Sequence, residues 1–147
     1  MQQCCNNKIK EKIYNKVEKI GGRLTKIRRL IIDILANNSC LLSKKNLLNE
    51  LKKIKIKPHR STIYREIKFL VKNKIIKKFI LMDNEYYEII QDHHHHLICI
   101  NCFSISRINL KNCFKDKNKI IKQNKFEITD HNFEIYGRCL KCLINKK

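Results

Sequence analysis

The sequence predicts an α+β protein in which an N-terminal winged helix-turn-helix domain precedes a small α/β domain with a zinc site. Three observations support this fold class. Apolar residues recur at helical spacing as far as about residue 73. The period then changes to the alternation of a short hairpin. Two Cys-x-x-Cys pairs follow, at Cys99/Cys102 and Cys139/Cys142.

Four helices are expected in the first part of the chain. The first covers residues 8–20 and ends at a pair of glycines. Thr25 and Ser43 are suitable N-caps for the second and third helices, because their hydroxyl groups can accept a hydrogen bond from a backbone N–H of the first turn. Pro58 is a favourable first residue for the fourth helix, which is expected over residues 58–73.

In the segment IIKKFILMDNEYYEII, residues 75–90, apolar and polar residues alternate as in two strands, with a turn at Asp83-Asn84. Together with the preceding helices, this hairpin is typical of a winged helix-turn-helix. The later segments LICIN, SISRINL, KFEITDH and NFEIYGRC are expected to be strands, with a lysine-rich helix around residues 112–123. The expected organisation is a winged-helix domain over 1–85, a hinge over 86–92 and a small α/β domain over 93–147.

Positive charge dominates the composition. The chain has 33 Lys and Arg residues against 13 Asp and Glu, a net charge of +20, which favours polyanionic partners. The abundance of Lys, Ile and Asn is also typical of AT-rich coding, so charge alone gives only partial support for nucleic-acid binding. No segment approaches the ~18–20 apolar residues of a membrane span, and no signal peptide opens the chain. We therefore expect a cytoplasmic protein that does not enter the membrane.

The paired cysteines predict a structural zinc site. Each Cys-x-x-Cys turn directs two thiolates toward one point, and two such turns supply the four sulfurs of a closed tetrahedral site. The alternatives are incidental thiols or redox pairs, but in a reducing compartment the doubled spacing favours zinc. The other cysteines, which lack this spacing and are expected to be free or buried thiols, are Cys4, Cys5, Cys40 and Cys113.

Four consecutive histidines, residues 93–96, directly precede the first cysteine pair. Successive side chains of a strand point to opposite faces. An extended segment would therefore place His94 and His96 on one face, and His93 and His95 on the other. The pattern predicts halves of two metal sites, although a solvated histidine run is the alternative.

Other parts of the chain could complete these sites. Glu88 is the acid nearest to the face of His94 and His96, and His131 is the most suitable distant partner for the other face. His59, at the start of the fourth helix, is expected to contact a phosphate or to have no special role.

Four motifs in the same order resemble the ferric uptake regulator (Fur) family of metal-dependent transcriptional regulators. These are RLTKIRRLIIDIL, STIYREIKFL, HHHHLICINC and HNFEIYGRCLKC, and the resemblance covers roughly residues 20–143. It implies a DNA-binding winged-helix domain and a C-terminal dimerisation domain. It also implies a homodimer that binds a double-stranded, AT-rich inverted-repeat operator, as a repressor, when it is metallated.

The resemblance assigns roles to residues. The structural zinc ligands correspond to Cys99, Cys102, Cys139 and Cys142. The sensory ligands correspond to Glu88, His94 and His96, and an additional site corresponds to His93, His95 and His131. The DNA-binding positions correspond to Arg23, Arg28, Arg60, Ser61, Thr62, Tyr64 and Arg65, with Tyr64 against thymine methyls, Arg65 on phosphate and Arg23 near the minor groove.

Three positions depart from the family pattern, two of them in the sensory site. Leu41 stands where many members have a histidine, Arg107 where many have a second acid, and Phe103 where a glycine is common. Three remaining ligands suit tetrahedral Zn²⁺ slightly better than six-coordinate Fe²⁺ or Mn²⁺ as the second divalent metal.

Other functions remain open from the sequence. A constitutive zinc-stabilised DNA-binding protein with a degraded sensory site would explain Leu41 and Arg107, and a peroxide-sensing variant of the family would use a similar ligand set. A metal-dependent nuclease would need an open metal and a general base. The sequence has no HExxH or paired-carboxylate motif, so we expect no enzymatic activity.

Overall fold

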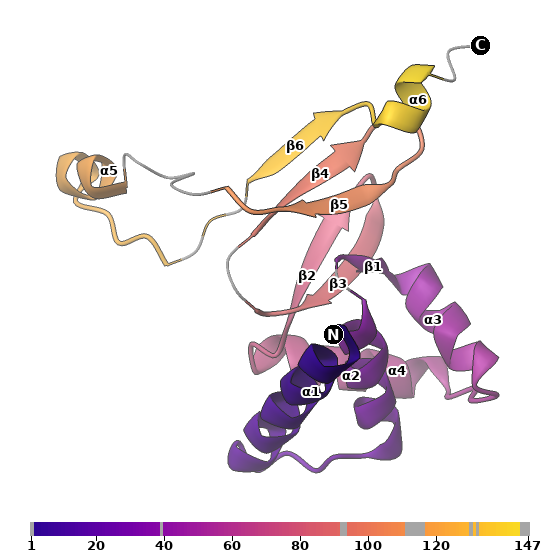
Figure 1. Cartoon of the computed structure of the whole chain (residues 1–147). Coiled ribbons are helices and arrows are strands. Elements are labelled where there is room, and N and C mark those ends of the chain that lie inside the picture. The colour runs from indigo at the N-terminus through magenta and orange to yellow at the C-terminus, as the bar shows by residue number, and fades with distance from the viewer. Residues whose placement is uncertain are drawn as a thin grey trace. The chain divides into compact units, whose positions relative to one another are not determined.

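The computed structural model describes residues 2–38, 40–91, 94–110, 117–129, 131 and 133–144. It divides the chain into two compact units, an N-terminal unit of residues 1–91 and a C-terminal unit of residues 92–147. The N-terminal unit is mainly helical and the C-terminal unit contains a second, separate sheet (Figure 1). The predicted α+β fold class is confirmed. No helix in the described part of the chain is both long and apolar enough to span a membrane.

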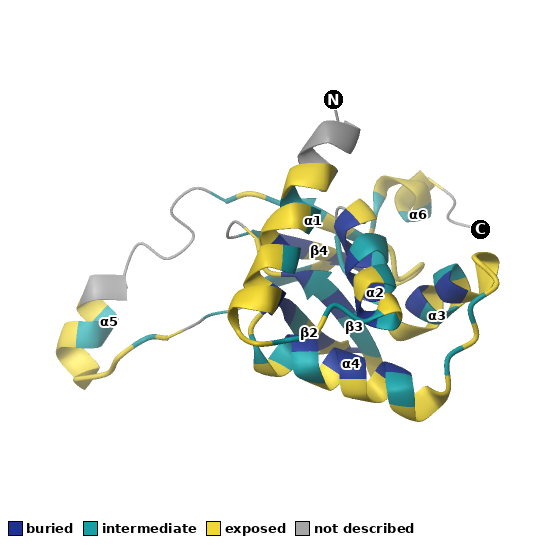
Figure 2. Ribbon diagram, turned by 90° about the horizontal axis from the view of Figure 1, so that it is seen from below, coloured by how far each residue is buried: buried dark blue, intermediate teal, exposed yellow. Residues whose placement is uncertain are grey.

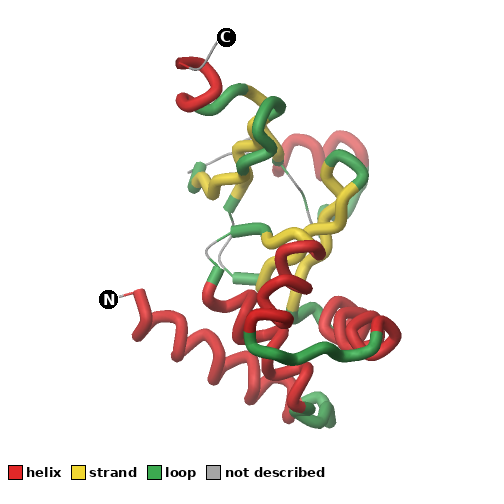
Figure 3. Tube along the Cα trace, turned by 90° about the vertical axis from the view of Figure 1, so that its right-hand side faces the viewer, coloured by secondary structure: helices red, strands yellow, loops and turns green. Residues whose placement is uncertain are grey.

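The described part of the N-terminal unit contains four helices and a small antiparallel sheet of order β1-β3-β2, with helices and strands distinguished by colour in Figure 3. Its elements are α1 (Gln2–Lys19), α2 (Lys26–Asn37), β1 (Leu42–Ser43), α3 (Lys44–Lys53), α4 (Arg60–Lys72), β2 (Ile76–Leu81) and β3 (Asn84–Ile89). Strand β1 was not predicted from the sequence. It is only two residues long, and pairing of Leu42 and Ser43 with β3 defines it.

The predicted helix caps are present. The Thr25 hydroxyl accepts a hydrogen bond from the N–H of Arg28 at 3.2 Å, and the Ser43 hydroxyl accepts one from Asn46 at 3.1 Å. The predicted start of the fourth helix at Pro58 is wrong by two residues. His59 has extended backbone angles and is the N-cap, so α4 begins at Arg60.

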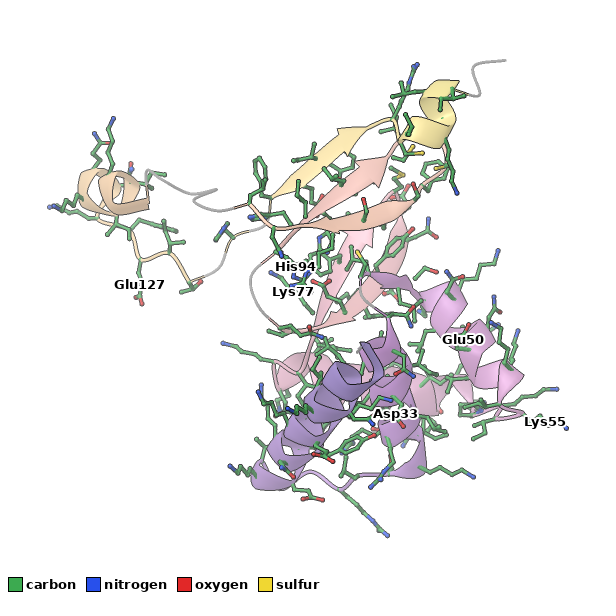
Figure 4. The ribbon with its side chains drawn as sticks, in the orientation of Figure 1. Asp33, Glu50, Lys55, Lys77, His94 and Glu127 are labelled. Atoms are coloured by element: carbon green, nitrogen blue, oxygen red, sulfur yellow. The ribbon has the colours of Figure 1, made fainter. Side chains whose placement is uncertain are left out.

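The core of the N-terminal unit lies where the inner faces of the helices meet one face of the hairpin (Figure 2). Tyr14 of α1 donates a hydrogen bond to Asp33, which is labelled on α2 in Figure 4. The described core residues with the lowest exposure include Val17, Ile31, Ile32, Leu47, Leu51, Leu70 and Ile76.

The connection between α1 and α2 requires glycine. Gly21 has a φ of +72°, which favours glycine. A Cβ on Gly22 would lie 2.6 Å from Cζ of Phe69 and 2.9 Å from the carbonyl oxygen of Val17. The end of α1 therefore packs so closely on α4 that no side chain fits at this position.

A buried ion pair joins α2 to α4. Nε of Arg28 donates to Oε2 of Glu66 at 2.6 Å, and Nη1 of Arg28 donates to the carbonyl oxygen of Arg23 at 2.6 Å. The Thr25 hydroxyl donates to Oε1 of Glu66 at 3.1 Å, and the Arg28 guanidinium stacks 3.6 Å over the ring of Phe69. These contacts attach the loop before α2 to α4, the helix that carries most of the predicted DNA-contacting residues.

The hairpin turn lies one residue earlier than predicted. Met82 and Asp83 form the turn, with φ values of 50° and 60°, and Asn84 already pairs with Leu81. Positive φ at both central residues is the type I′ geometry, which matches the twist of the flanking strands.

The C-terminal unit contains a three-stranded mixed sheet of order β5-β4-β6, in which β5 is antiparallel and β6 is parallel to β4. Its elements are β4 (His95–Cys99), β5 (Ile105–Ile108), α5 (Lys117–Asn124), β6 (Glu134–Gly137) and α6 (Leu140–Ile144). The prediction of a strand over KFEITDH is wrong, because its described residues form a turn and loop. Helix α5 is described from Lys117, and α6 was not predicted.

Candidate metal centre

The four paired cysteines converge in the C-terminal unit. Cys99 ends β4, Cys102 lies in the turn before β5, Cys139 directly precedes α6 and Cys142 lies within it. Their sulfur atoms all lie within 4.8 Å of one another, and sulfur atoms gather beside α6 in Figure 4. The Sγ atoms of Cys102 and Cys139 are 3.6 Å apart, close to the ~3.8 Å edge of a tetrahedron with Zn–S bonds of ~2.3 Å.

Backbone hydrogen bonds hold the first cysteine turn in shape. The N–H of Phe103 donates to the carbonyl oxygen of Cys99 at 3.0 Å, and the N–H of Cys99 donates to the carbonyl oxygen of Ser104 at 2.9 Å. Phe103 has a φ of 57°, in the left-handed region that favours glycine. The turn forms here although the glycine common in the family is absent.

The sulfur atoms lie in different electrostatic environments. Backbone N–H groups of Cys102 and Cys139 lower the pKa of the Cys99 thiol to about 6, because they stabilise its thiolate. Hydrogen bonds to the sulfurs of Cys102 and Cys139 raise the pKa of Cys142 to about 12. A soft divalent cation would replace the remaining thiol protons, because only the thiolate is a metal ligand.

The histidine segment divides as strand alternation predicts for its described members. The ring centroids of His94 and His96 are 4.9 Å apart, and those of His95 and His131 are 5.9 Å apart. The His95 and His96 side chains are only 1% and 3% exposed. His93 lies outside the described residues. The structure therefore brings together two histidine pairs, one formed within the segment and one with His131.

Two charged residues flank His96 in the sheet. The register pairs His96 with Arg107 of β5 and with Glu134 of β6. Neighbouring residues in adjacent strands share one face, so a cation and an acid stand beside His96. Sequence reasoning missed Glu134, because the parallel pairing of β4 with β6 cannot be derived from the spacing of the two segments.

The remaining sensory positions lie in the N-terminal unit. Glu88 is half-buried near the end of β3 and pairs in register with Lys77 of β2. Leu41 is half-buried before β1. Of the other cysteines, Cys40 is a half-buried free thiol. The side chains of Cys4 and Cys5, and the whole of Cys113, lie outside the described part of the chain.

Most predicted DNA-contacting residues lie at the start of α4. Arg60, Ser61 and Arg65 are exposed, Thr62 is half-buried, and Tyr64 exposes 64% of its surface. Arg23 is also exposed, in the loop before α2. Arg28 differs from these, because its guanidinium is buried against Glu66 and Phe69. Its partner Glu66 was not identified from the sequence, where it stands between apolar positions of the helix.

The comparison with known families agrees with this arrangement. Residues 19–136 match the profile of the ferric uptake regulator family. A ferric uptake regulation protein of Synechococcus elongatus is 30% identical over 127 residues, which cover 83% of this chain and 86% of that protein. One from Helicobacter pylori strain 26695 is 23% identical over 136 residues, which cover 91% of each chain.

Solved structures share the fold. The Helicobacter pylori ferric uptake regulator, described as having three functional metal binding sites, is 22% identical with a TM-score of 0.77, and the alignment covers 97% of this chain and 96% of that one. A zinc-bound manganese uptake regulator is 26% identical with a TM-score of 0.68, covering 87% of this chain and 98% of that one.

Proposed function

This chain belongs to the ferric uptake regulator family, whose members are metal-responsive transcriptional regulators without enzymatic activity. From this premise we propose which metals it binds, which residues contact DNA and with which partner it assembles. The four-cysteine cluster suggests a structural zinc, and the His94 and His96 rings, 4.9 Å apart, suggest a second metal. The cysteine cluster is the observation on which the proposal chiefly depends.

The structural zinc is held by Cys99, Cys102, Cys139 and Cys142. Four thiolates leave no position for a substrate or an exchanging ligand. The ion ties the end of β4 to α6, and its binding free energy contributes directly to folding.

The second metal is held by Glu88, His94 and His96. Only five residues separate Glu88 from His94, so the covalent chain allows both side chains to reach one ion. Three ligands suit Zn²⁺ slightly better than Fe²⁺ or Mn²⁺. Glu134 offsets the positive charge of Arg107 beside His96, which supports a functional rather than a degraded site. A further metal uses His93, His95 and His131.

DNA binding is assigned to the exposed start of α4 and to Arg23. These side chains are free of the core and present apolar, hydrogen-bonding and positively charged groups to a duplex. The operator is double-stranded DNA, expected to be an AT-rich inverted repeat. We assign Arg28 an indirect part in this surface, because its guanidinium is buried in the ion pair with Glu66.

The C-terminal unit is assigned to homodimerisation. It exposes large apolar side chains on its strands, in the turn after β4 and on α6, which a second copy of the chain would cover. Those exposed by 36–72% include Leu97, Ile100, Tyr136, Leu140, Leu143 and Ile144. A two-fold dimer would present two copies of α4 to the two half-sites of the operator.

The DNA assignment predicts different results for two neighbouring residues. Tyr64→Ala is expected to cost ~1–3 kcal/mol of operator affinity and to relax sequence preference, because its ring reads thymine methyl groups. Arg65→Ala should weaken all duplexes about equally and flatten the salt dependence, because it contacts phosphate. Fluorescence anisotropy at several salt concentrations, with a duplex selected from a random pool, measures both effects.

Two controls accompany this experiment. Tyr64→Phe keeps the ring and should bind nearly as wild type, and Lys12→Ala removes an exposed charge on α1, outside the residues assigned to DNA contact. If Tyr64→Ala and Arg65→Ala both bound with wild-type affinity, α4 would not be the recognition helix.

The two histidine pairs are expected to have different functions. Replacing His94 and His96 by Ala should abolish the metal-dependent gain in operator affinity, while the structural zinc stays bound. Replacing His95 and His131 by Ala should reduce thermal stability or dimerisation and leave most of that gain. Operator titrations with Zn²⁺, Fe²⁺ and Mn²⁺, on protein that retains only the structural zinc, measure the difference.

The same titration tests a second candidate function. A constitutive DNA-binding protein with a degraded sensory site is favoured by Arg107, which the register sets beside His96. Operator affinity that is equal with and without added metal would support this function, and Arg107→Glu would then be expected to introduce a metal response.

A further inference from the structure

A cleft of about 710 Å³ lies in the N-terminal unit, between α3, α4 and the β2–β3 hairpin. Its volume falls within the range of about 300–1,000 Å³ that is typical of small-molecule sites. One face of α4 forms much of its wall, because residues of this helix at spacings of three and four line it. None of its lining residues is a cysteine or a histidine.

The floor of the cleft is apolar. Ile63 and Ile67 of α4 line it, each with less than 9% of its surface exposed, and Leu48 of α3 and Val71 of α4 extend it. A DNA duplex cannot bury these side chains, because its backbone is charged and too wide to enter a cleft of this size. The apolar floor therefore needs a ligand other than the DNA that is assigned to the exposed start of α4.

The rim of the cleft is strongly basic. Five cationic side chains line it: Lys44, Arg60, Lys68, Lys72 and Lys78. The lining contains one acid, Glu85, which accepts a hydrogen bond from Lys44 at 2.7 Å and others from Lys78 and Tyr87. These bonds lower the pKa of Glu85 to about 2, so it is ionised at neutral pH but already paired. An excess of positive charge surrounds the apolar floor.

We propose that this cleft binds a small amphipathic anion, an aliphatic or aromatic carboxylate whose apolar body covers Ile67 and Val71 and whose carboxylate meets Lys68 and Lys72. Apolar burial provides the attraction and the cations select the charged head group. Arg60 and Tyr64 also line the cleft. An occupied cleft therefore competes with DNA, a consequence that rests on the proposed function.

Calorimetric titration of the intact, zinc-loaded protein tests this proposal. Decanoate should bind saturably with one molecule per chain, and uncharged decanol should bind about tenfold more weakly. Lys68→Gln/Lys72→Gln should weaken decanoate binding by about tenfold, as expected for the loss of two exposed ionic contacts. The control Lys12→Gln/Lys19→Gln removes the same charge from exposed positions of α1 and should leave binding unchanged.

Val71→Phe, which fills the floor, should abolish decanoate binding in protein whose circular dichroism is unchanged. No saturable binding to the wild type, equal binding of decanol, or equal weakening by the α1 control would overturn the proposal. If Val71→Phe altered the oligomeric state and no decanoate bound, the cleft would be an interface between copies. If decanoate bound as expected but duplex affinity did not change, the ligand site would stand and the placement of DNA on α4 would fail.

Discussion

Cys139→Ser is expected to remove one zinc ion per chain and to unfold the C-terminal unit. The four sulfurs lie within 4.8 Å of one another, in a unit whose described buried side chains are only His95, His96, Ile98 and Cys99. Structural zinc sites of this kind contribute ~10–16 kcal/mol of apparent binding free energy. The small core of the C-terminal unit could not replace that contribution. Colorimetric zinc release measures the first consequence, and thermal unfolding and sedimentation measure the second.

Cys40→Ser is the matched control, because Cys40 is a half-buried free thiol of the N-terminal unit. It should retain full zinc content and wild-type stability. The helical signal of α1–α4 should survive in Cys139→Ser, since those helices have a core of their own. A dimeric Cys139→Ser protein with full zinc content and an unchanged melting temperature would show that the cluster is not a structural zinc site.

Glu66→Ala is expected to lower the free energy of unfolding of the N-terminal unit by ~3–5 kcal/mol, because it leaves the charge of Arg28 buried without its partner. Both residues are only 9% exposed, and their contact is 2.6 Å long. A loss of this size is a large part of the ~5–15 kcal/mol that stabilises a typical domain. Urea unfolding followed by circular dichroism of the helices measures it.

A double substitution identifies the cause. Arg28→Met/Glu66→Met should be more stable than Glu66→Ala, because the double change leaves no unpaired charge in the interior. The exposed pair of Lys53 and Glu50 on α3 is the control, and Glu50→Ala should change stability by less than ~1 kcal/mol. Equal losses from Glu66→Ala and Glu50→Ala would mean that the buried pair does not stabilise the link between α2 and α4.

The parts of the fold that local interactions determine were predictable from the sequence. The caps at Thr25 and Ser43 and the apolar spacing of α2–α4 depend on residues within a few positions of one another. Strand β1 was missed, because its two residues pair only with a distant strand. The strand expected over KFEITDH was wrong, because alternation without a neighbouring strand to pair with does not form a sheet.

The same distinction applies to the candidate sites. The pairing of sulfurs within each Cys-x-x-Cys was predictable, because a separation of three residues can direct two sulfurs toward one point. That the two pairs meet depends on the parallel pairing of β4 with β6. The position of Arg28 was not predictable, because its partner Glu66 is 38 residues away and the ion pair depends on how α2 packs on α4. The flanking of His96 by Arg107 and Glu134 likewise required the register of the sheet.

The two cysteine turns enclose residues 103–138, so a bound zinc ion ties the ends of a long loop that contains α5. The entropy lost when a loop closes grows only with the logarithm of its length, and each doubling costs about 0.6 kcal/mol. Insertions or deletions around α5 should therefore have little effect on metal affinity. One residue inserted between Cys99 and Cys102 would instead displace a ligand. Length variation in this unit is consequently tolerated around α5 and forbidden within the cysteine turns.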